Sequence, residues 1–536
     1  MREMKCPLRA LLWICLPSIV AMGMVGASFG QTLSGFITNV DNSRSFELGT
    51  VRIVLNSDTK CDINAVSYAV ATERKIQDLV HATIHFSFST FPTSWNVQHV
   101  ECNDLGVQIG LLVKVTGKTG AASGLQAQRV SVFRIRDGRI LGKTQPSGRL
   151  SGGAVLEEMP RMDSSSHKWS GNIWMDGYPV NVTTQTHLRS APVGSQMAFG
   201  YFGPPGSGPI FGIKPTGNCF IRNPSAGLLR QGTSVIYKAA RKSDGQIAAT
   251  YICLWGDHMA ASARQEITFP VELPDYVLKS PGFIKLHRHG HLEIVPDLVL
   301  QKYVSEIGAD LVPKYAQVAS GVDSSVPNFR FFVIRQSEPA LRYAAILSKG
   351  WTYGITRPAF DDAAIAMPDG LIAIPDSTLV RLSSRGQLAA VLSFGITQVL
   401  QRQFLVTYRS RQYFGGIYNL PSGPYADILA RDEQALRIGI RQMYLAGYDI
   451  REAPFAWAVA QGKPVNNPVI NSKHPDKEIP WYAAYAFNYI SQYYKDVDYS
   501  KLKRGRREYQ QFLQELRKTD PEAFEQAKPQ SGSKHK

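Results

Sequence analysis

The sequence predicts a multidomain protein, with two small all-β modules followed by an α+β, mainly helical domain. First, its 536 residues exceed what one hydrophobic core usually holds. Second, the chain up to about residue 262 reads as short strands punctuated by Gly, Asn and Asp, and parts of it repeat. Third, from about residue 297 apolar residues recur at three- and four-residue steps, the period of helices with one buried face.

Residues 1–30 read as a secretion signal. Arg2, Lys5 and Arg9 precede an apolar run over residues 10–24, and small residues follow it as a cleavage site. The run is shorter than the roughly twenty residues that a membrane-spanning helix needs, although an uncleaved anchor is the alternative. We therefore expect an exported protein, periplasmic or secreted, in a compartment that allows disulfide bonds.

Composition and charge narrow the expected partners. Hydrophobic residues make up 44% and charged residues 19% of the chain, which is typical of globular protein and argues against global disorder. The formal net charge of +16 suits contact with an anionic envelope surface. Residues 501–507 are basic, but an exported protein rarely meets nucleic acid, so no nucleic-acid partner is expected.

Strand-and-turn patterns recur in the first half of the chain. The repeated pairs are Ser34–Ile37 with Ser170–Ile173, Val51–Lys60 with Tyr178–His187, and Gly110–Val132 with Gly232–Leu254. Two copies of one β module follow from this order, at residues 31–137 and 169–262, with a Ser- and Gly-rich linker at 138–168. Short strands of even spacing with Gly turns suggest OB-like barrels.

Each copy contains two cysteines, and neither pair is a CxxC motif. A zinc knuckle is therefore not expected, and disulfides within the modules are. The repeat favours pairing Cys61 with Cys102 and Cys219 with Cys253, although three connectivities are formally possible.

Aromatic residues in the second module are candidates for a binding face. OB-like barrels can bind nucleic acid or sugar chains through aromatic and basic side chains. The candidates are Trp174, Tyr178, Tyr237 and Trp255. Filling and flanking the barrel is the commoner use of such residues.

The second half of the chain changes from strand-like to helical patterns. A proline-rich connector occupies residues 263–296, and a charged tail begins at residue 496 and runs to 536. Between them, the pattern over residues 297–495 predicts one domain. It contains an amphipathic helix over residues 297–319, a strand over 328–334, a helix carrying Leu388 to Leu400, and a helix over 425–446.

Short motifs in this domain follow one another in a specific order. They are Tyr303–Tyr315, Asn328–Val333, Pro368–Ile374, Gln387–Leu392, Val399–Arg402, Ala435, Gly439, Ala446–Asp449 and His474–Pro475. Together they resemble family forty-eight of the zinc metallopeptidases (HtpX, CAAX prenyl protease and BepA type). The resemblance implies a gluzincin-like domain whose central helix carries HExxH, and a substrate-side edge strand that can take an extended peptide. That strand falls on Gly370, Leu371, Ile372, Ala373 and Ile374.

The zinc site that the resemblance implies is replaced in this sequence. The first zinc His falls on Phe394, the general base on Gly395, the second His on Gln398 and the third ligand on Asp432. A catalytic zinc normally keeps three protein ligands and a water, and Phe394 has no donor atom. Without the metal or the base, nothing would activate the attacking water. No His in the chain is followed by Glu, so the motif has not moved elsewhere.

A separate metal candidate lies at the end of the connector. His287, His289, His291 and Glu293 alternate along the chain, so on a strand they would share one face. Three His and a carboxylate could hold zinc or copper. Gly290 and the connector context favour a polar surface strand as the other interpretation.

The sequence thus predicts a catalytically inactive pseudopeptidase of the cell envelope that binds protein segments and needs no cofactor. One alternative is an active zinc metalloendopeptidase with an altered site that uses Gln398, Asp432 and His474. The other is an envelope- or glycan-binding protein that acts through its β modules.

Overall fold

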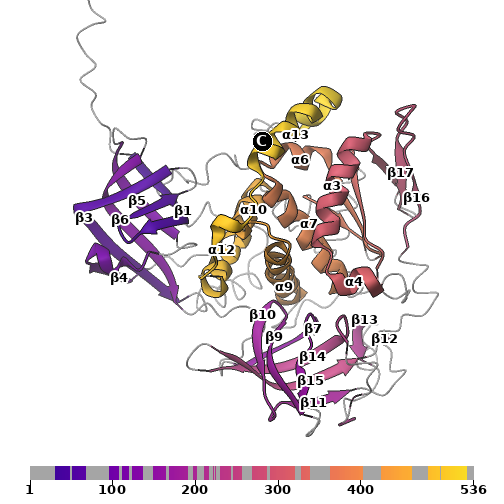
Figure 1. Ribbon diagram of the computed structural model, residues 1–536, viewed down its shortest axis with the longest axis horizontal. Coiled ribbons are helices and arrows are strands. Elements are labelled where there is room, and N and C mark those ends of the chain that lie inside the picture. Colours follow the sequence, from indigo (N-terminus) through magenta and orange to yellow (C-terminus); the bar gives the residue numbers. More distant parts are fainter. Residues whose placement is uncertain are drawn as a thin grey trace, which may run out of the picture.

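The computed structural model shows an α+β protein with several separate sheets and a group of helices (Figure 1). The structure describes residues 31–48, 51–67, 96–107, 112–119, 124–136, 149–163, 168–190, 197–201, 211–215, 221–222, 224, 230–242, 246–255, 268–286, 290–319, 327–337, 363–367, 369–401, 424–460, 481–494 and 496–527. The expected signal over residues 1–30 lies outside these ranges. In the described part of the chain, no helix is both long and apolar enough to cross a membrane.

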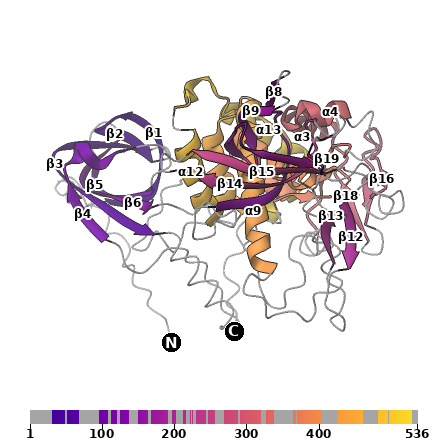
Figure 2. The same cartoon turned by 90° about the horizontal axis from the view of Figure 1, so that it is seen from below.

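The first sheet has its own hydrophobic core. Its strands are β1 (Gln31–Asn42), β2 (Ser45–Leu48), β3 (Val51–Ser67), β4 (Asn96–Val100), β5 (Leu112–Thr119) and β6 (Gly124–Arg136), and a short 3-10 turn, η1, covers Cys102–Leu105. The order is β2-β1-β5-β6-β3-β4, and β2 also pairs with β3, so the pairings of five strands return to their start (Figure 2). Alternate residues such as Ile53, Val115 and Val132 are fully buried between them.

The second sheet lies beside the helices rather than apart from them (Figure 1). Its strands are β7 (Arg149–Val155), β8 (Arg161–Asp163), β9 (Lys168–Met175), β10 (Tyr178–Val182), β11 (His187–Ser190), β14 (Ser234–Arg241) and β15 (Ile247–Trp255). The order is β7-β14-β15-β10-β9-β8, β11 also pairs with β15, and a bridge joins Leu156 to Met175. A separate hairpin consists of β12 (Met197–Tyr201) and β13 (Phe211–Pro215).

The two sheets share pairing registers along the repeat read from the sequence. Val113 pairs with Val132 in the first sheet, and Val235 pairs with Leu254 at the matching place in the second. Both ladders shift register at the same distance from these pairs, between Thr116 and Gly117 in the first sheet and between Lys238 and Ala239 in the second. The Thr59 hydroxyl donates to the Ala127 carbonyl at 2.8 Å, and the Thr186 hydroxyl donates to the Ala249 carbonyl at 2.8 Å. A threonine at the same place in the repeat thus donates to the carbonyl of a neighbouring strand in both sheets.

One part of the expected repeat differs from the structure. The Ile37–Leu48 pair of the first sheet corresponds to the Leu156–Met175 bridge of the second. Strand β1 is therefore matched by β7, and the second sheet begins at Arg149, inside the residues expected as a linker. The Ser and Gly content of β7 resembles a linker, but pairing with β14 overrides that local preference.

The third sheet belongs to the second half of the chain. Its order is β16 (Val271–Glu272), β17 (Gly282–Lys285), β18 (His291–Ile294), β19 (Arg330–Ile334), β21 (Leu371–Pro375) and β20 (Ile365–Ala366). Only the β19–β21 pair is parallel. Three of these strands, β16 to β18, lie within the proline-rich segment expected as a connector.

Helices pack on this sheet and on the second one. They are α3 (Leu298–Leu311), α4 (Lys314–Ala319), α6 (Asp376–Arg381), α7 (Arg385–Leu400), α9 (Pro424–Leu445), α10 (Ala453–Ala460), α12 (Trp481–Tyr493), α13 (Arg506–Thr519) and α14 (Pro521–Gln526), with 3-10 turns η5 (Ile450–Glu452) and η6 (Tyr499–Lys501). Asp297 caps α3 by accepting hydrogen bonds from the Val299 and Leu300 amides.

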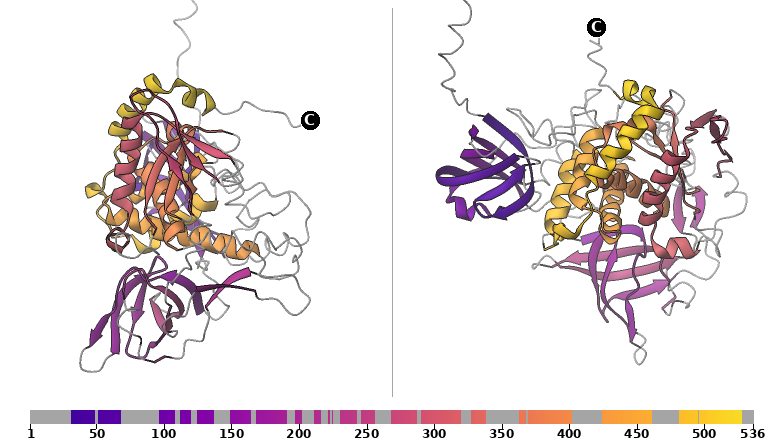
Figure 3. Two further views of the ribbon diagram at one scale, coloured as in Figure 1. Left: turned by 90° about the vertical axis from the view of Figure 1, so that its right-hand side faces the viewer. Right: turned by 45° about the horizontal axis from the view of Figure 1, so that its top comes forward.

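The residues expected as a charged tail form part of the folded domain. Tyr509 of α13 is fully buried, and its hydroxyl donates to the Leu379 carbonyl at 2.8 Å. Asp520, which caps α14, pairs with Arg335 next to β19. The two helices therefore close one end of the helical layer (Figure 3).

Candidate functional site

Helix α7 holds the positions at which the family resemblance implies a metal site. The Ser384 side chain caps its first turn by accepting a hydrogen bond from the Gln387 amide. Helices α3, α9 and α10 and strands β20 and β21 surround it. All but two of its residues are buried, so α7 is the central helix of this domain.

The first ligand and base positions of α7 are filled by apolar packing. Phe394 is 6% exposed and meets the Trp457 ring edge-on, with ring centres 5.3 Å apart. Gly395 faces the third sheet, where a Cβ would lie 3.4 Å from the Ala366 Cβ. Gln398, at the second ligand position, is half-buried. Two of the three positions on α7 thus carry no group that can hold a metal or take a proton.

The third ligand position lies on the neighbouring helix. Helix α9 approaches α7 closely at Gly439, where a Cβ would lie 3.1 Å from the Ser393 hydroxyl oxygen. Asp432 belongs to α9, but its side chain lies outside the described part of the chain, as does His474. Among the described residues, no three His, Cys, Asp or Glu side chains come together as a metal site.

The strand that the resemblance implies as the substrate-side edge, β21, lies inside the third sheet rather than at its edge. Leu371, Ile372, Ala373 and Ile374 belong to β21 and are fully buried. Strand β19 pairs with one edge of β21 and β20 with the other, so the structure differs from the expected edge strand.

A tight turn explains why β21 is covered. Gly370 has a φ of +94°, a conformation that favours glycine, and the Met367 amide donates to the Leu371 carbonyl at 2.8 Å. This turn folds residues 363–367 back along β21. The Pro-Asp-Gly sequence before the strand is the signal that could have predicted it.

The His-rich candidate is only partly within the described residues. His287 and His289 lie outside them. His291 and Glu293 lie on β18 two residues apart, with a buried Leu between them, as expected for one face of a strand. The His291 ring lies edge-on to Phe283 at 4.7 Å between ring centres, and Glu293 lies 3.8 Å from Arg335.

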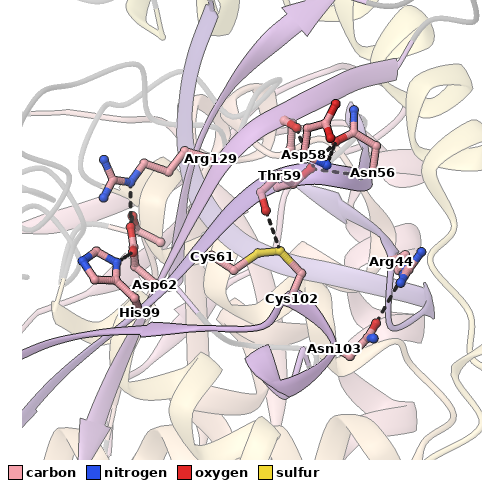
Figure 4. The surroundings of a disulfide bond; sticks show 12 residues. Arg44, Asn56, Asp58, Thr59, Cys61, Asp62, His99, Cys102, Asn103 and Arg129 are labelled. Carbon is pink, nitrogen blue, oxygen red and sulfur yellow. Dashed lines mark hydrogen bonds and ion pairs between the residues drawn. A yellow bond between two sulfur atoms is a disulfide. The ribbon is translucent and has the colours of Figure 1, made fainter.

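The disulfide expected in the first sheet is confirmed. The sulfur atoms of Cys61 and Cys102 are 2.02 Å apart, and the bond ties β3 to the 3-10 turn η1 (Figure 4). Cys253 is also disulfide-bonded, and its expected partner Cys219 lies outside the described residues.

A buried carboxylate next to this disulfide orients two exposed basic side chains. Asp62 is 2% exposed and accepts from Arg129 at 2.6 Å, and its other oxygen lies 2.5 Å from the His99 ring nitrogen (Figure 4). Burial raises the pKa of Asp62, but the hydrogen bonds from Arg129 and His99 outweigh it and hold the pKa below its usual value.

A second buried charge cluster, which was not predicted from the sequence, joins the second sheet to α9. The turn between β9 and β10 consists of Asp176 and Gly177, both with positive φ (58° and 72°), as in the tight hairpin turns that favour Asp-Gly. The Asp176 carboxylate accepts from Arg437 at 2.8 Å, Gln434 at 2.9 Å and the Tyr237 hydroxyl at 2.5 Å. This turn is therefore inserted against one face of α9.

The neighbouring turn of α9 makes a parallel set of contacts. Arg441 pairs with Glu158 and lies 3.4 Å from Glu157, while its guanidinium lies 4.2 Å from the centre of the Trp174 ring. Burial raises the pKa of Glu157 to about 7, although the Arg441 charge acts in the opposite direction.

Three of the four aromatic residues named as candidates for a binding face take part in this interface. Tyr178 and Tyr237 are 0% and 1% exposed, and the Arg437 guanidinium lies 4.3 Å from the centre of the Tyr178 ring. Trp174 stacks on Tyr494 at 5.9 Å. The side chain of Trp255 lies outside the described part.

Comparisons with known proteins add no assignment. No protein-family model matches the chain, and no curated protein matches it either.

Proposed function

We propose that this chain is an exported, catalytically inactive binding protein whose second half is a gluzincin-like, metallopeptidase-type domain that binds protein segments in the cell envelope. The observation that carries the proposal is the contact of Phe394 with Trp457. At the position where the resemblance implies a zinc ligand, this domain packs one aromatic ring against another. A binding role needs the frame of the domain but not its metal.

The alternative, an active zinc metalloendopeptidase, would require ligands from Gln398, Asp432 and His474. Metal content and proteolysis separate the two functions. We expect the purified chain to retain less than one tenth of an equivalent of zinc after dialysis and to leave casein intact. One tightly held zinc per chain, with casein cleavage that a chelator abolishes, would overturn the proposal.

The family resemblance itself can be tested by restoring two ligands. Phe394→His with Gln398→His places two imidazoles one helical turn apart on α7. With Asp432 as the third ligand, we expect the double variant to gain one zinc per chain. Each single variant serves as a matched control and should gain none. A double variant that keeps its helical circular dichroism signal but binds no zinc would contradict the placement of the site.

The first sheet supports a second candidate function, envelope-polymer binding. We infer an OB-like barrel from its ring of five strands, in which β3 and β6 pair in parallel. Arg129 and His99 have side chains 51% and 78% exposed and are held by Asp62, and Lys60 lies opposite Arg129 on the paired strand. This preorganised basic face suits an anionic polymer.

Binding to an anionic cell-wall polymer tests this second function. Lys60→Gln with Arg129→Gln should weaken co-sedimentation of the full chain with the polymer at least fivefold, because two contact charges are lost. Lys302→Gln with Lys314→Gln, on the helical domain, removes the same charge elsewhere. Equal weakening by both double variants would assign the effect to net charge and reject a site on the first sheet.

A further inference from the structure

The hairpin formed by β16 and β17 presents large apolar side chains to solvent. Leu273 is 65% exposed, Val277 is 91% exposed and Leu278 is 75% exposed. Within the described ranges, no other six-residue stretch contains three large apolar side chains that are more than half exposed. The hairpin lies at the periphery of the third sheet, away from the helices (Figures 1 and 3). Clustered exposed apolar side chains usually mark an interaction surface.

The turn at the end of the hairpin is closed by its own hydrogen bonds. Asp275 and Ser280 exchange backbone hydrogen bonds, both at 3.0 Å. One oxygen of the Asp275 side chain accepts from the Val277 and Leu278 amides, both at 2.9 Å. Lys279 completes the turn with a φ of +53°. Because these bonds fix the backbone, the exposure of Val277 and Leu278 is built into the fold.

The base of the hairpin is anchored in the domain. Ile284 on β17 is fully buried. Gly282 lies so close to β16 that a Cβ would be 2.3 Å from the Glu272 carbonyl oxygen, which only glycine allows. Lys285 and Glu272 pair across the two strands at 3.6 Å. The apolar tip therefore projects from a fixed support.

The composition of the tip indicates what it contacts. Leu273 follows β16 directly, and Val277 and Leu278 lie within the turn that Asp275 and Ser280 close. A bilayer surface can take all three side chains without a matching shape, whereas a protein pocket must fit each one. Tyr276 and Lys279 flank the two most exposed residues, and these residue types favour the headgroup region.

The charge of the chain selects the kind of bilayer. Its formal net charge is +16, so an anionic surface attracts it. We propose that the β16–β17 hairpin is a lipid-binding element, which inserts Val277 and Leu278 into the surface of an anionic bilayer with Lys279 at the phosphate level. The insertion reaches the headgroup boundary and does not span the bilayer.

Vesicle co-sedimentation of the full chain tests the proposal. We expect binding to vesicles of phosphatidylcholine with about one third phosphatidylglycerol, and weaker binding to phosphatidylcholine alone. Val277→Asp with Leu278→Asp should lower the partition coefficient at least tenfold, because two apolar side chains lose their burial in lipid. Lys279→Gln should weaken binding severalfold on the anionic vesicles only.

A matched control adds the same charges on another exposed apolar pair. Leu298 and Val299, at the start of α3, are 57% and 72% exposed, and Leu298→Asp with Val299→Asp should leave vesicle binding within about twofold. Equal loss by both double variants would reduce the effect to net charge and overturn the proposal. Absence of wild-type binding to either vesicle would also overturn it. So would a concentration-dependent dimer that only the hairpin variant abolishes, without vesicle binding, because a second copy of the chain would then be the occupant.

Discussion

The buried Asp176–Arg437 pair allows a direct test of how the second sheet is held on α9. We predict that Asp176→Asn loosens this contact. Asn is the chosen replacement because it tolerates a φ of 58° and is itself favoured in Asn-Gly hairpin turns. The change therefore removes the negative charge and leaves the turn and the shape of the side chain in place.

The expected magnitude comes from what Arg437 loses. Its side chain is 1% exposed and always charged, and its carboxylate partner lies 2.8 Å away. Removing one partner of a buried pair costs about 3–5 kcal/mol. Glu433 lies 4.0 Å from the same guanidinium and compensates part of the lost charge. We therefore expect about 3 kcal/mol, which is a roughly hundredfold rise in the local opening equilibrium.

Hydrogen exchange of the α9 backbone amides measures this opening. The control is Asp41→Asn, which removes the partner of Arg52 from an exposed pair at 3.2 Å and should change exchange in the first sheet by less than about fivefold. If Asp176→Asn speeds α9 exchange by less than about threefold, the ion pair does not hold the second sheet in place, and apolar packing alone must do so.

Other features of the structure give three predictions. Burial raises the pKa of Glu157 from 4.5 to about 7, so its contribution to the free energy of unfolding is fully present below pH 4.5 and is lost as the pH rises towards 7. Glu157→Gln should therefore flatten the dependence of the melting temperature on pH across that window. An unchanged slope would count against this assignment. Cys102→Ser removes the disulfide between Cys61 and Cys102, which are 41 residues apart in sequence, and should destabilise the first sheet by about 2–4 kcal/mol. Faster hydrogen exchange of the β3 amides measures this loss. An equal increase in exchange of β15 would contradict a local effect. Gly177→Ala places a Cβ 2.5 Å from a side-chain carbon of α9 and should speed hydrogen exchange of the α9 amides. Gly290→Ala is the control, because Gly290 also has a positive φ but has open space around it. Equal effects of the two variants would show that backbone strain, rather than the contact with α9, matters.

Local patterns predicted the elements that depend on neighbouring residues. The apolar period over residues 297–319 corresponds to α3 and α4, and Ser384 caps α7 as a serine before a helix is expected to do. The aligned segments at 110–132 and 232–254 adopt the same register because strand, turn and strand recur at the same spacing. The Cys61–Cys102 bond followed from that repeat.

Composition misled where a segment gains its structure from a distant partner. Strand β7 reads as a linker because it is rich in Ser and Gly, yet it pairs with β14. The edge position of Leu371 to Ile374 was implied by the family resemblance, and residues 363–367 instead fold back along these residues. For β7 the deciding contact is a backbone ladder with a strand far along the chain, which local preference does not encode.

By itself, the sequence determined the succession of strand-rich and helical parts, the repeat, the first disulfide and the absence of His at the positions of α7 where the family resemblance implies zinc ligands. Those features depend on residue identity and on spacing along the chain. Only the tertiary structure decided that Phe394 packs on Trp457, that Tyr178 and Tyr237 are buried, and that Asp176 binds Arg437 across a separation of 261 residues. Burial and ion pairing depend on which surfaces meet, and the meeting of the second sheet with α9 is set by packing over the whole fold.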